Sequence, residues 1–301
     1  MVNGSLIKME IRLKCNDIDI EKTFACGQCF RWKHRRGRDG FTGVAGKRAA
    51  RIRTECGNIV IEEIGKAGGE DSAVFWRNYF DIDRDYGAAQ DYLKAHDKKI
   101  ATAIEAGDGI RILRQDLWET IVSFIISQNN NIPRIQGCIE NLAKLYGEEV
   151  ATLTDSEAPE GIAVLHALPN PEVLSKLTAD DLAPIRLGYR APYLIKAARE
   201  YLEIAPRFKE SLSAEEELDL LLSLTGVGPK VASCISLFGL SRIESFPVDV
   251  WVKRVMHEVY GLSESDARGM KKYAAEHFGP YGGLAQQYLF YWIRERNNQN
   301  L

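Results

Sequence analysis

The hydrophobic pattern of this chain changes its period near residue 72, and that change restricts the folds open to it. From there onward, apolar residues recur at helical spacing. We therefore expect an α+β protein: a small N-terminal antiparallel β domain with flanking helices (1–105), packed on a mainly α-helical body (106–301). Short, partly alternating runs separated by Gly, Asp and Asn predict strands at 6–13, 41–44, 49–54 and 58–64.

Capping residues mark several helix boundaries in the second region. Asp116 precedes an apolar helix and Glu119 stands three residues later, which predicts a capping box. Pro133 opens a further helix that ends near Gly147, and Gly107 is expected to end an earlier one. The expected helices cover 72–80, 88–96, 99–107, 115–131, 133–147, 171–187, 191–204, 214–224, 230–240, 250–260, 264–277 and 281–295.

Length and composition are those of an ordinary globular protein. The chain has 301 residues, of which 45% are apolar and 27% charged. Its longest clean apolar run, at 121–126, is far too short to span a bilayer. The N-terminus has neither the basic region nor the apolar stretch of a signal peptide. We expect an intracellular monomer without a membrane partner, in the cytoplasm or nucleoid if the source is prokaryotic.

Charge and cysteine content exclude little by themselves. The net charge is −3, but residues 31–53 hold nine Lys/Arg against one acid. From charge alone, a solvated β-hairpin is a better interpretation of this stretch than a nucleic-acid surface. Cys26 and Cys29 form a C-x-x-C motif, but no second pair completes a zinc site and the histidines are dispersed. We therefore expect no metal centre built from these side chains.

The sequence LTGVGPKVASC (224–234) predicts a tight turn followed at once by a helix. Gly226 and Gly228 can adopt backbone angles closed to other residues, and Pro229 suits the first helical position. The N–H groups at 226–230 would converge on an anion such as a DNA phosphate, helped by the helix N-terminus. Many turns between helices use glycine without any ligand, so the motif alone leaves both interpretations open.

Lys230 follows this turn directly and lies in the first turn of the expected helix. An ammonium is unfavourable there, so the lysine either reaches solvent or is held as a neutral amine, the better nucleophile. Asp249 comes nineteen residues later, where it could simply cap the helix at 250–260. A fixed carboxylate near an amine also suits a reaction that develops positive charge on a sugar, as glycosidic cleavage does.

The segment LTGVGPKVASCISLFGL…SFPVDVW resembles the helix-hairpin-helix, Gly/Pro-rich loop and aspartate signature of base-excision DNA glycosylases. The version with a lysine after the hairpin is typical of members that also cleave the strand. The resemblance covers nearly the whole chain, with less detail in 33–105 and 148–183, and places the hairpin at about 214–240. Further segments similar to the 8-oxoguanine DNA glycosylase family follow in its order: CGQCFRW (26–32), RILRQDLWETIVSFIISQNNNIPRI (111–135), LGYRAPY (187–193) and GPYGGLAQQYLF (279–290).

The resemblance implies an enzyme of DNA repair that acts on double-stranded DNA containing oxidised guanine. Such an enzyme flips out and excises 8-oxoguanine opposite cytosine, and then nicks the strand by β-elimination through a lysine Schiff base. Lys230 would be the nucleophile, and Asp249 would stabilise the oxocarbenium-like transition state. No cofactor is expected to be required, although the hairpin is a candidate site for a bound monovalent or divalent cation.

The resemblance also assigns the residues around the lesion base. Cys234, which shares a helix face with Lys230, and Phe290 would stack on its two sides. Gln286 would hydrogen-bond its Watson–Crick edge. The Gly27 carbonyl would accept from the N7–H that oxidised guanine carries and guanine lacks. Taken singly, Cys234 and Phe290 would be ordinary core residues and Gln286 a solvated helix residue.

A second group of residues is assigned to the DNA around the lesion. Asn129 would fill the space that the flipped base leaves, and Tyr189 would act as a wedge beside the estranged base. Arg134 and Arg190 would donate to the unpaired acceptors of the opposite cytosine, although each could be an ordinary surface or phosphate-contacting arginine. The residues expected to hold a phosphate at the hairpin are Gly226, Gly228 and Lys230.

The chain departs from the family pattern at two positions, and two other functions stay open. Where many members carry a phosphate-contacting histidine this chain has Trp251, and the carboxylate that orients such a histidine is missing at Ile293. A glycosylase/lyase for other oxidised bases, of the endonuclease III kind, would usually have an iron–sulfur loop, but no cysteine follows Cys234. A non-catalytic helix-hairpin-helix module would leave the pairing of Lys230 with Asp249 unexplained.

Overall fold

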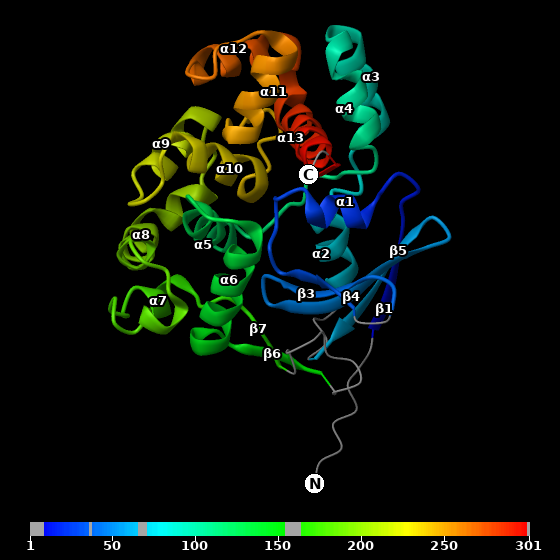
Figure 1. The fold of residues 1–301 in the computed structure, drawn as a ribbon. Helices are drawn as coiled ribbons and strands as arrows, with labels where there is room; N and C mark the ends of the chain where they lie inside the picture. The colour runs from blue at the N-terminus through cyan, green and yellow to red at the C-terminus, as the bar shows by residue number, and fades with distance from the viewer. Residues whose placement is uncertain (1–8, 36–37, 66–70, 154–163, 300–301) are drawn as a thin grey trace.

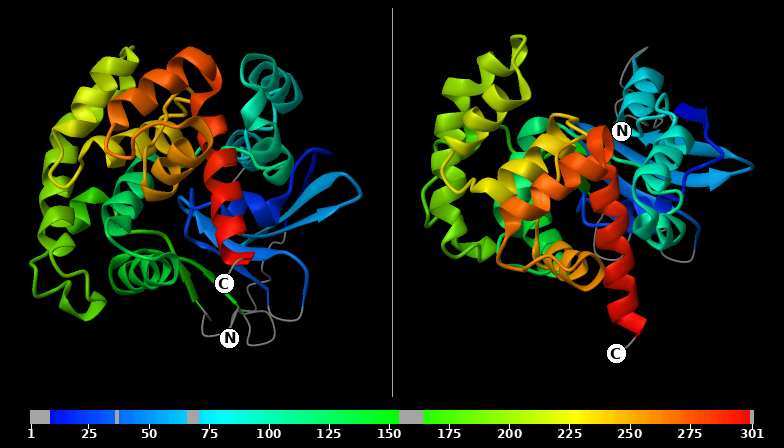
Figure 2. Two further views of the ribbon diagram at one scale, coloured as in Figure 1. Left: turned by 45° about the horizontal axis from the view of Figure 1, so that its top comes forward. Right: turned by 90° about the horizontal axis from the view of Figure 1, so that it is seen from above.

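The computed structural model describes residues 9–35, 38–65, 71–153 and 164–299. An antiparallel sheet stands beside a larger group of helices (Figures 1 and 2), which confirms the expected α+β class. The sheet has the strand order β1-β5-β4-β3-β2. Its strands are β1 (Met9–Lys14), β2 (Trp32–His34), β3 (Phe41–Ala45), β4 (Arg48–Glu55) and β5 (Asn58–Ile64).

The helices of the described residues agree with most of the expected ones, and α1 had not been expected. They are α1 (Ile20–Ala25), α2 (Ser72–Tyr79), α3 (Tyr86–His96), α4 (Ala101–Ala106), α5 (Leu117–Ser127), α6 (Ile132–Tyr146), α7 (Pro171–Leu174), α8 (Arg190–Ile204), α9 (Ala214–Leu222), α10 (Pro229–Gly239), α11 (Val250–Tyr260), α12 (Ala267–His277) and α13 (Gly282–Gln299). Short 3₁₀ turns are η1 (Lys98–Ile100), η2 (Ala183–Ile185), η3 (Ala205–Lys209) and η4 (Gly279–Tyr281).

Alternation along the strands gives the sheet two different faces. Phe41, Ile52 and Ile61 are cross-strand neighbours and pack with Trp76 of α2. On the other face, Val44, Ala49 and Ile64 pack against the small ribbon formed by β6 (Glu149–Thr152) and β7 (Val164–His166). The ribbon was not expected, because its strands are short.

The basic stretch at 31–53 does contain the expected β-hairpin, but its charges are paired with acids of neighbouring elements. Arg53 lies 2.7 Å from Glu62, and Arg31, which is buried, lies 3.1 Å from Glu140 of α6. The description of this hairpin as simply solvated was therefore wrong in part. The Arg31–Glu140 pair joins this stretch to α6, and the Arg53–Glu62 pair links two strands of the sheet.

The larger core lies among the helices. Helix α5 is buried along most of its length and packs against α10, while α13 lies between α11 and α4 (Figure 1). Side chains of α3 and α4, such as Leu93 and Ile104, belong to this core, although both helices precede residue 106. The division of the chain at residues 105 and 106 stays a prediction.

Two local predictions were wrong. Asp116 caps α5 as expected, but the Glu119 carboxylate does not close a capping box: it accepts from the Gly46 N–H of the sheet at 2.8 Å. The single helix expected at 171–187 ends at Leu174. The turn that follows is closed by Asp181, which accepts from the Thr178 N–H and hydroxyl at 2.8 and 2.7 Å. Such side-chain bonds compete with a continuing helix.

Candidate active site

A pocket of about 800 Å³ opens between the loop at 26–30, the junction of α5 with α6, and the helices α10, α11 and α13. These segments are far apart in sequence, and the pocket brings together most of the predicted site residues. Those that line it are Gly27, Asn129, Gly228, Lys230, Cys234, Asp249, Gln286 and Phe290.

The hairpin between α9 and α10 is held by side chains from outside it. Gly226 has a φ of +83°, and a Cβ there would lie 3.0 Å from Tyr193, so both the backbone and the space require glycine. The Gln128 amide donates to the Gly226 carbonyl at 2.8 Å. Glu200 of α8 accepts from the N–H and hydroxyl of Thr225 at 2.6 and 2.9 Å. These contacts fix the hairpin relative to α5 and α8.

Lys230 is the second residue of α10, directly behind the hairpin. Gly228 caps this helix without a side-chain hydrogen bond, so the first N–H groups of the helix are left for an external acceptor. The Lys230 side chain is half-buried and its Nζ lies 5.5 Å from the centroid of the Phe124 ring. The amine is therefore held inside the pocket rather than extended into solvent.

Asp249 both caps α11 and lines the pocket. Its Oδ1 accepts from the Val252 N–H at 2.8 Å. Burial raises the pKa of this carboxyl, and the Val252 N–H and the charge of Lys230 oppose the rise. Burial likewise raises the pKa of the Cys234 thiol, one turn after Lys230 on α10. The pocket thus holds an amine, a carboxyl of raised pKa and a neutral thiol side by side.

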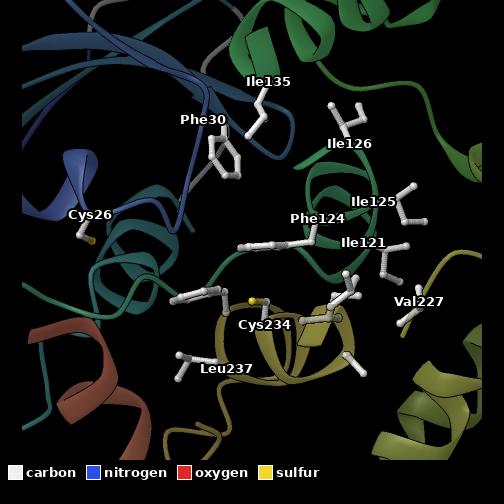
Figure 3. Close-up of a cluster of buried hydrophobic side chains, with 14 of the residues drawn as sticks. Cys26, Phe30, Ile121, Phe124, Ile125, Ile126, Ile135, Val227, Cys234 and Leu237 are labelled. Carbon is white, nitrogen blue, oxygen red and sulfur yellow. The ribbon is translucent and has the colours of Figure 1, made fainter. Parts of the chain in front are cut away.

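Aromatic rings form one wall of the pocket. Phe124 stacks on Phe238 with 5.5 Å between centroids and 11° between planes, and Phe30 meets Phe124 edge-on at 5.9 Å. Figure 3 shows Phe124 between Phe30 and Cys234, with Ile135 close to Phe30. A largely apolar wall with few polar groups suits the burial of a planar ligand such as a base.

Gly27 reaches the pocket on a loop that only glycine can form here. Its φ is +79°, and a Cβ would lie 3.3 Å from the Phe290 ring. Gln28, which is 1% exposed, holds the loop: its Nε2 donates to the Arg111 carbonyl at 2.7 Å and its Oε1 accepts from the Leu113 N–H at 2.8 Å. Sequence reasoning missed Gln28, although a polar residue inside the apolar CGQCFRW segment was a usable signal.

Helix α13 presents a row of side chains at four-residue intervals. Gln286 is 3% exposed, and Phe290 follows one turn later. Arg294 comes one turn further, with its guanidinium 5.3 Å from the Phe290 centroid and a bond of 2.6 Å to the Ala25 carbonyl. The Gln286 Oε1 accepts from the Nε2 of Gln287 at 2.7 Å. Gln287 and Arg294 were not predicted, although helical spacing from Gln286 would have found Arg294.

The three asparagines after α5 have different positions. Asn130 donates to the Ile126 carbonyl at 3.1 Å, and Asn131 caps α6 by accepting from the Arg134 N–H at 3.1 Å. These two fit the description of a polar helix terminus. Asn129 is exposed at the pocket rim and has a φ of 47°. Of the three, Asn129 is the one whose side chain is not recorded as bonding or capping α5 or α6.

Tyr189 and the predicted arginines lie beside the pocket, not in it. Tyr189 is 48% exposed, and its hydroxyl donates to the Gln128 carbonyl at 3.3 Å. Arg190 is buried and donates to the carbonyls of Leu187 and Asn129, at 3.2 and 2.8 Å, and through its Nε to Gln128 at 2.9 Å. Arg134 is exposed, with one bond of 3.1 Å to the Arg186 carbonyl.

The position of the missing histidine is occupied by a cation–π pair. Trp251 lines the pocket, and the guanidinium of Arg254 lies 5.1 Å from its ring centroid. Ile293 is 2% exposed and part of the helical core. Lys253 lines the same wall one turn after Asp249 and brings positive charge to it.

The described residues contain no group of three or more His, Cys, Asp or Glu placed to hold a metal ion. A cation at the hairpin would therefore have to be bound by backbone carbonyls, and the Gly226 carbonyl already accepts from Gln128. Burial raises the pKa of Cys26 to about 11, and that of Cys29 well above the ordinary value, so both are thiols. Within the same described ranges, no helix combines the length and hydropathy needed to cross a membrane.

Comparison with known proteins agrees with this geometry. Residues 10–121 match the 8-oxoguanine DNA glycosylase N-terminal domain, and residues 122–280 match the HhH-GPD superfamily of base excision DNA repair proteins. A probable N-glycosylase/DNA lyase of Methanothermobacter thermautotrophicus is 31% identical over 222 residues, which are 66% of this chain and 68% of that protein. An N-glycosylase/DNA lyase of Arabidopsis thaliana is 26% identical over 297 residues, 93% of this chain and 78% of that protein.

A solved structure shares the whole fold. The 8-oxoguanine glycosylase/lyase of Clostridium acetobutylicum, in complex with double-stranded DNA containing cytosine opposite 8-oxoguanine, has a TM-score of 0.85. It is 32% identical, and the match covers 98% of this chain and 99% of that one. The resemblance drawn from the sequence is thereby confirmed: this chain belongs to the HhH-GPD superfamily of base excision DNA repair proteins and, within it, to the 8-oxoguanine DNA glycosylase/lyases.

Proposed function

We propose that this protein is a bifunctional glycosylase that flips 8-oxoguanine out of duplex DNA opposite cytosine, releases the base and then nicks the strand. The observation that carries this proposal is the shared pocket of Lys230 and Asp249, each at the start of a helix beside an apolar wall. The DNA in the solved Clostridium acetobutylicum complex, which contains cytosine opposite 8-oxoguanine, supports the choice of substrate.

Lys230 would act as the nucleophile. Its Nζ, as the neutral amine, attacks C1′ of the deoxyribose while the bond from C1′ to N9 breaks and the base leaves with a proton. The sugar ring opens, and the amine and C1′ form a Schiff base. Loss of a C2′ proton then expels the 3′ phosphate by β-elimination, which nicks the strand, and water releases Lys230.

Asp249 would act electrostatically. The bond to the departing base breaks ahead of full attack, so positive charge develops on the sugar. A carboxylate fixed by the Val252 N–H at the start of α11 needs no reorganisation to stabilise that charge. Burial causes both the raised pKa of Asp249 and its strong electrostatic effect, because a partly desolvated carboxylate gains more from a nearby positive charge.

Recognition of the lesion would use the remaining pocket residues. Cys234 and Phe290 stack on the two faces of the base, and Gln286 meets its Watson–Crick edge. The Gly27 carbonyl accepts from N7–H of the lesion and repels the N7 lone pair of guanine. An unfavourable buried contact of this kind costs about 1–3 kcal/mol, which is one to two decades of discrimination.

The DNA around the lesion would be held by the neighbouring surface. Asn129 occupies the space that the base leaves, Tyr189 wedges beside the estranged cytosine, and Arg134 and Arg190 donate to its free acceptors. The residues proposed to hold a phosphate at the hairpin are Gly226, Gly228 and Lys230.

A monovalent or divalent cation bound by hairpin carbonyls would add to the phosphate site without taking part in the chemistry. We further propose that the protein acts as a monomer inside the cell, where its DNA substrate is, and that its two domains divide at residues 105 and 106.

The direct test uses duplexes that differ in a single base. The protein is incubated with 8-oxoguanine opposite cytosine, with guanine opposite cytosine and with an oxidised pyrimidine, and base release and nicking are followed separately. Release and nicking only of the first duplex are expected. Preferential release of the oxidised pyrimidine, or tight binding without any release, would contradict the proposal.

A further inference from the structure

Arg294 of α13 lines the pocket and has no assigned role. Its side chain is 15% exposed. The Nη2 atom donates to the Ala25 carbonyl at 2.6 Å, and the guanidinium carbon lies 5.3 Å from the centroid of the Phe290 ring. Ala25 is the last residue of α1, directly before the loop that carries Gly27. One arginine therefore contacts both segments that are proposed to recognise the base.

These two segments belong to different parts of the molecule. The loop with Gly27 lies between α1 and β2, whereas Phe290 belongs to the helical body. The loop abuts the ring, because a Cβ on Gly27 would lie 3.3 Å from it. The hydrogen bonds of Gln28 fix the loop to residues 111 and 113, and not to α13. Within the described part of the chain, the bond from Arg294 to Ala25 is thus the polar contact that relates the loop to α13.

Helix geometry places Arg294 behind the Phe290 ring. Side chains of a helix lean toward its N-terminus, so Arg294 reaches the ring from the side away from Gln286. The side that faces Gln286 is left open to a base. The last carbonyls of α1 have no partner within that short helix, so the Ala25 carbonyl is free to accept from the guanidinium. The contact of the cation with the ring is itself favourable.

We propose that Arg294 is a positioning residue for lesion recognition. It holds the Phe290 ring and the Gly27 loop at a fixed separation, so that a base stacked on Phe290 presents its N7 edge to the Gly27 carbonyl. The inference rests on the proposed function, because it takes Gly27 and Phe290 to contact the flipped base. It predicts that loss of Arg294 impairs steps that need the base and spares steps that do not.

The test separates recognition of the base from the chemistry of Lys230. Single-turnover base release is measured on duplex with 8-oxoguanine opposite cytosine, and nicking is measured on duplex in which an abasic site replaces the lesion. An abasic site has no base to position, so its nicking needs Lys230 but not the contacts of Arg294. Arg294→Met should slow base release by about tenfold or more, because small misplacements at a reacting centre are costly, and should leave nicking nearly unchanged. Arg294→Lys keeps a charged donor and should give an intermediate rate of release.

Two further variants keep the test decisive. Arg296→Met makes the same chemical change two residues later, where the arginine donates to Glu258 at 2.8 Å and does not line the pocket, and should keep both wild-type rates. Arg294→Gln replaces Arg294→Met if the latter does not fold. A wild-type rate of release in Arg294→Met, an equal loss on both duplexes, or a rate in Arg294→Lys no higher than in Arg294→Met would overturn the inference. Absence of any 8-oxoguanine release by the wild-type protein would instead contradict the proposed function itself.

Discussion

The pocket around Lys230 and the surface around Asn129 are adjacent, but their side chains are held differently. In the pocket, Lys230 and Asp249 are fixed at helix starts and face a shared space. At the surface, the donors of Arg190 are already bonded to backbone carbonyls of the loop that carries Asn129. The chemical groups are therefore in place before DNA binds, whereas the groups proposed to read the opposite strand must exchange partners.

Binding the flipped base and contacting the opposite strand should therefore have different free-energy costs. A preformed pocket loses little freedom when a base enters it, so its effects should be seen mainly in the rate of base release. The side chains at the opposite-strand surface must break hydrogen bonds within the protein before they can bind cytosine. Only the difference in free energy between the two sets of hydrogen bonds contributes to binding. Substitutions in the pocket should therefore reduce the rate of base release more than substitutions at the surface do.

The largest effect is expected for Asp249→Asn. Asparagine remains a good helix cap but cannot stabilise positive charge as a carboxylate does, so base release should slow by about 10²-fold or more while the melting temperature holds. In the wild type, the rate should fall as pH decreases through the raised pKa of Asp249, because protonation removes the charge. Single-turnover rates measured across pH test both the loss of rate in Asp249→Asn and the pH dependence of the wild type. If Asp249→Asn kept the wild-type rate and only lowered the melting temperature, Asp249 would be a helix cap and nothing more.

An intermediate effect is expected at the opposite-strand surface. The wild type should prefer cytosine over adenine opposite the lesion by about 1–3 kcal/mol, and Arg134→Met should relax that preference. The Arg134 side chain is exposed and, among the described residues, donates to the Arg186 carbonyl alone, so stability should change little. Arg190→Met should relax the preference and also lower the melting temperature, because it removes bonds to three carbonyls.

Rates on all four opposing bases must be compared at one salt concentration, because phosphate binding depends on salt. Equal wild-type rates on the four duplexes would remove the opposite-strand surface from the recognition scheme. Loss of rate in Arg134→Met by the same factor on every duplex would make this arginine a phosphate contact.

The smallest effect concerns Glu119, a half-buried carboxyl outside the pocket around Lys230. Burial raises its pKa from 4.5 to about 7, where it accepts from the Gly46 N–H of the sheet. The folded protein therefore keeps a proton that the unfolded chain releases, so this group's contribution to stability is complete below pH 4.5 and is lost as pH rises through about 7. Glu119→Gln should remove this pH dependence and stabilise the protein at pH 8 by on the order of 1 kcal/mol. Urea unfolding at pH 5 and pH 8 measures it, and an identical pH dependence in both proteins would contradict it.

Local signals in the sequence predicted the helices well where their caps are local. Asp116 and Asn131 cap α5 and α6, and Gly107 ends α4, each through a bond to a residue within four positions. Glu119 shows the limit of this reasoning, because its side chain accepts from Gly46 in the turn between β3 and β4, more than seventy residues away. Its capping box could not be excluded without the tertiary structure.

In the candidate site, too, some residues could be predicted from the sequence and others needed the structure. Spacing and resemblance together placed Lys230, Cys234 and Asp249, and the structure brings them into one pocket. Gln28 was missed because its role depends on bonds to Arg111 and Leu113, and such bonds have no sequence pattern. Its assignment needed the positions of individual polar atoms.

The central claim is that Lys230 forms a covalent intermediate with DNA, and borohydride trapping tests it most directly. A second half-buried amine, Lys271, donates to Ser233 at 2.9 Å beside Cys234, and burial lowers its pKa, so it is the natural rival nucleophile. With duplex carrying 8-oxoguanine opposite cytosine, the wild type and Lys271→Gln should give a trapped adduct, and Lys230→Gln should give none. An adduct that persists in Lys230→Gln, or disappears in Lys271→Gln while that variant stays folded, would contradict the account.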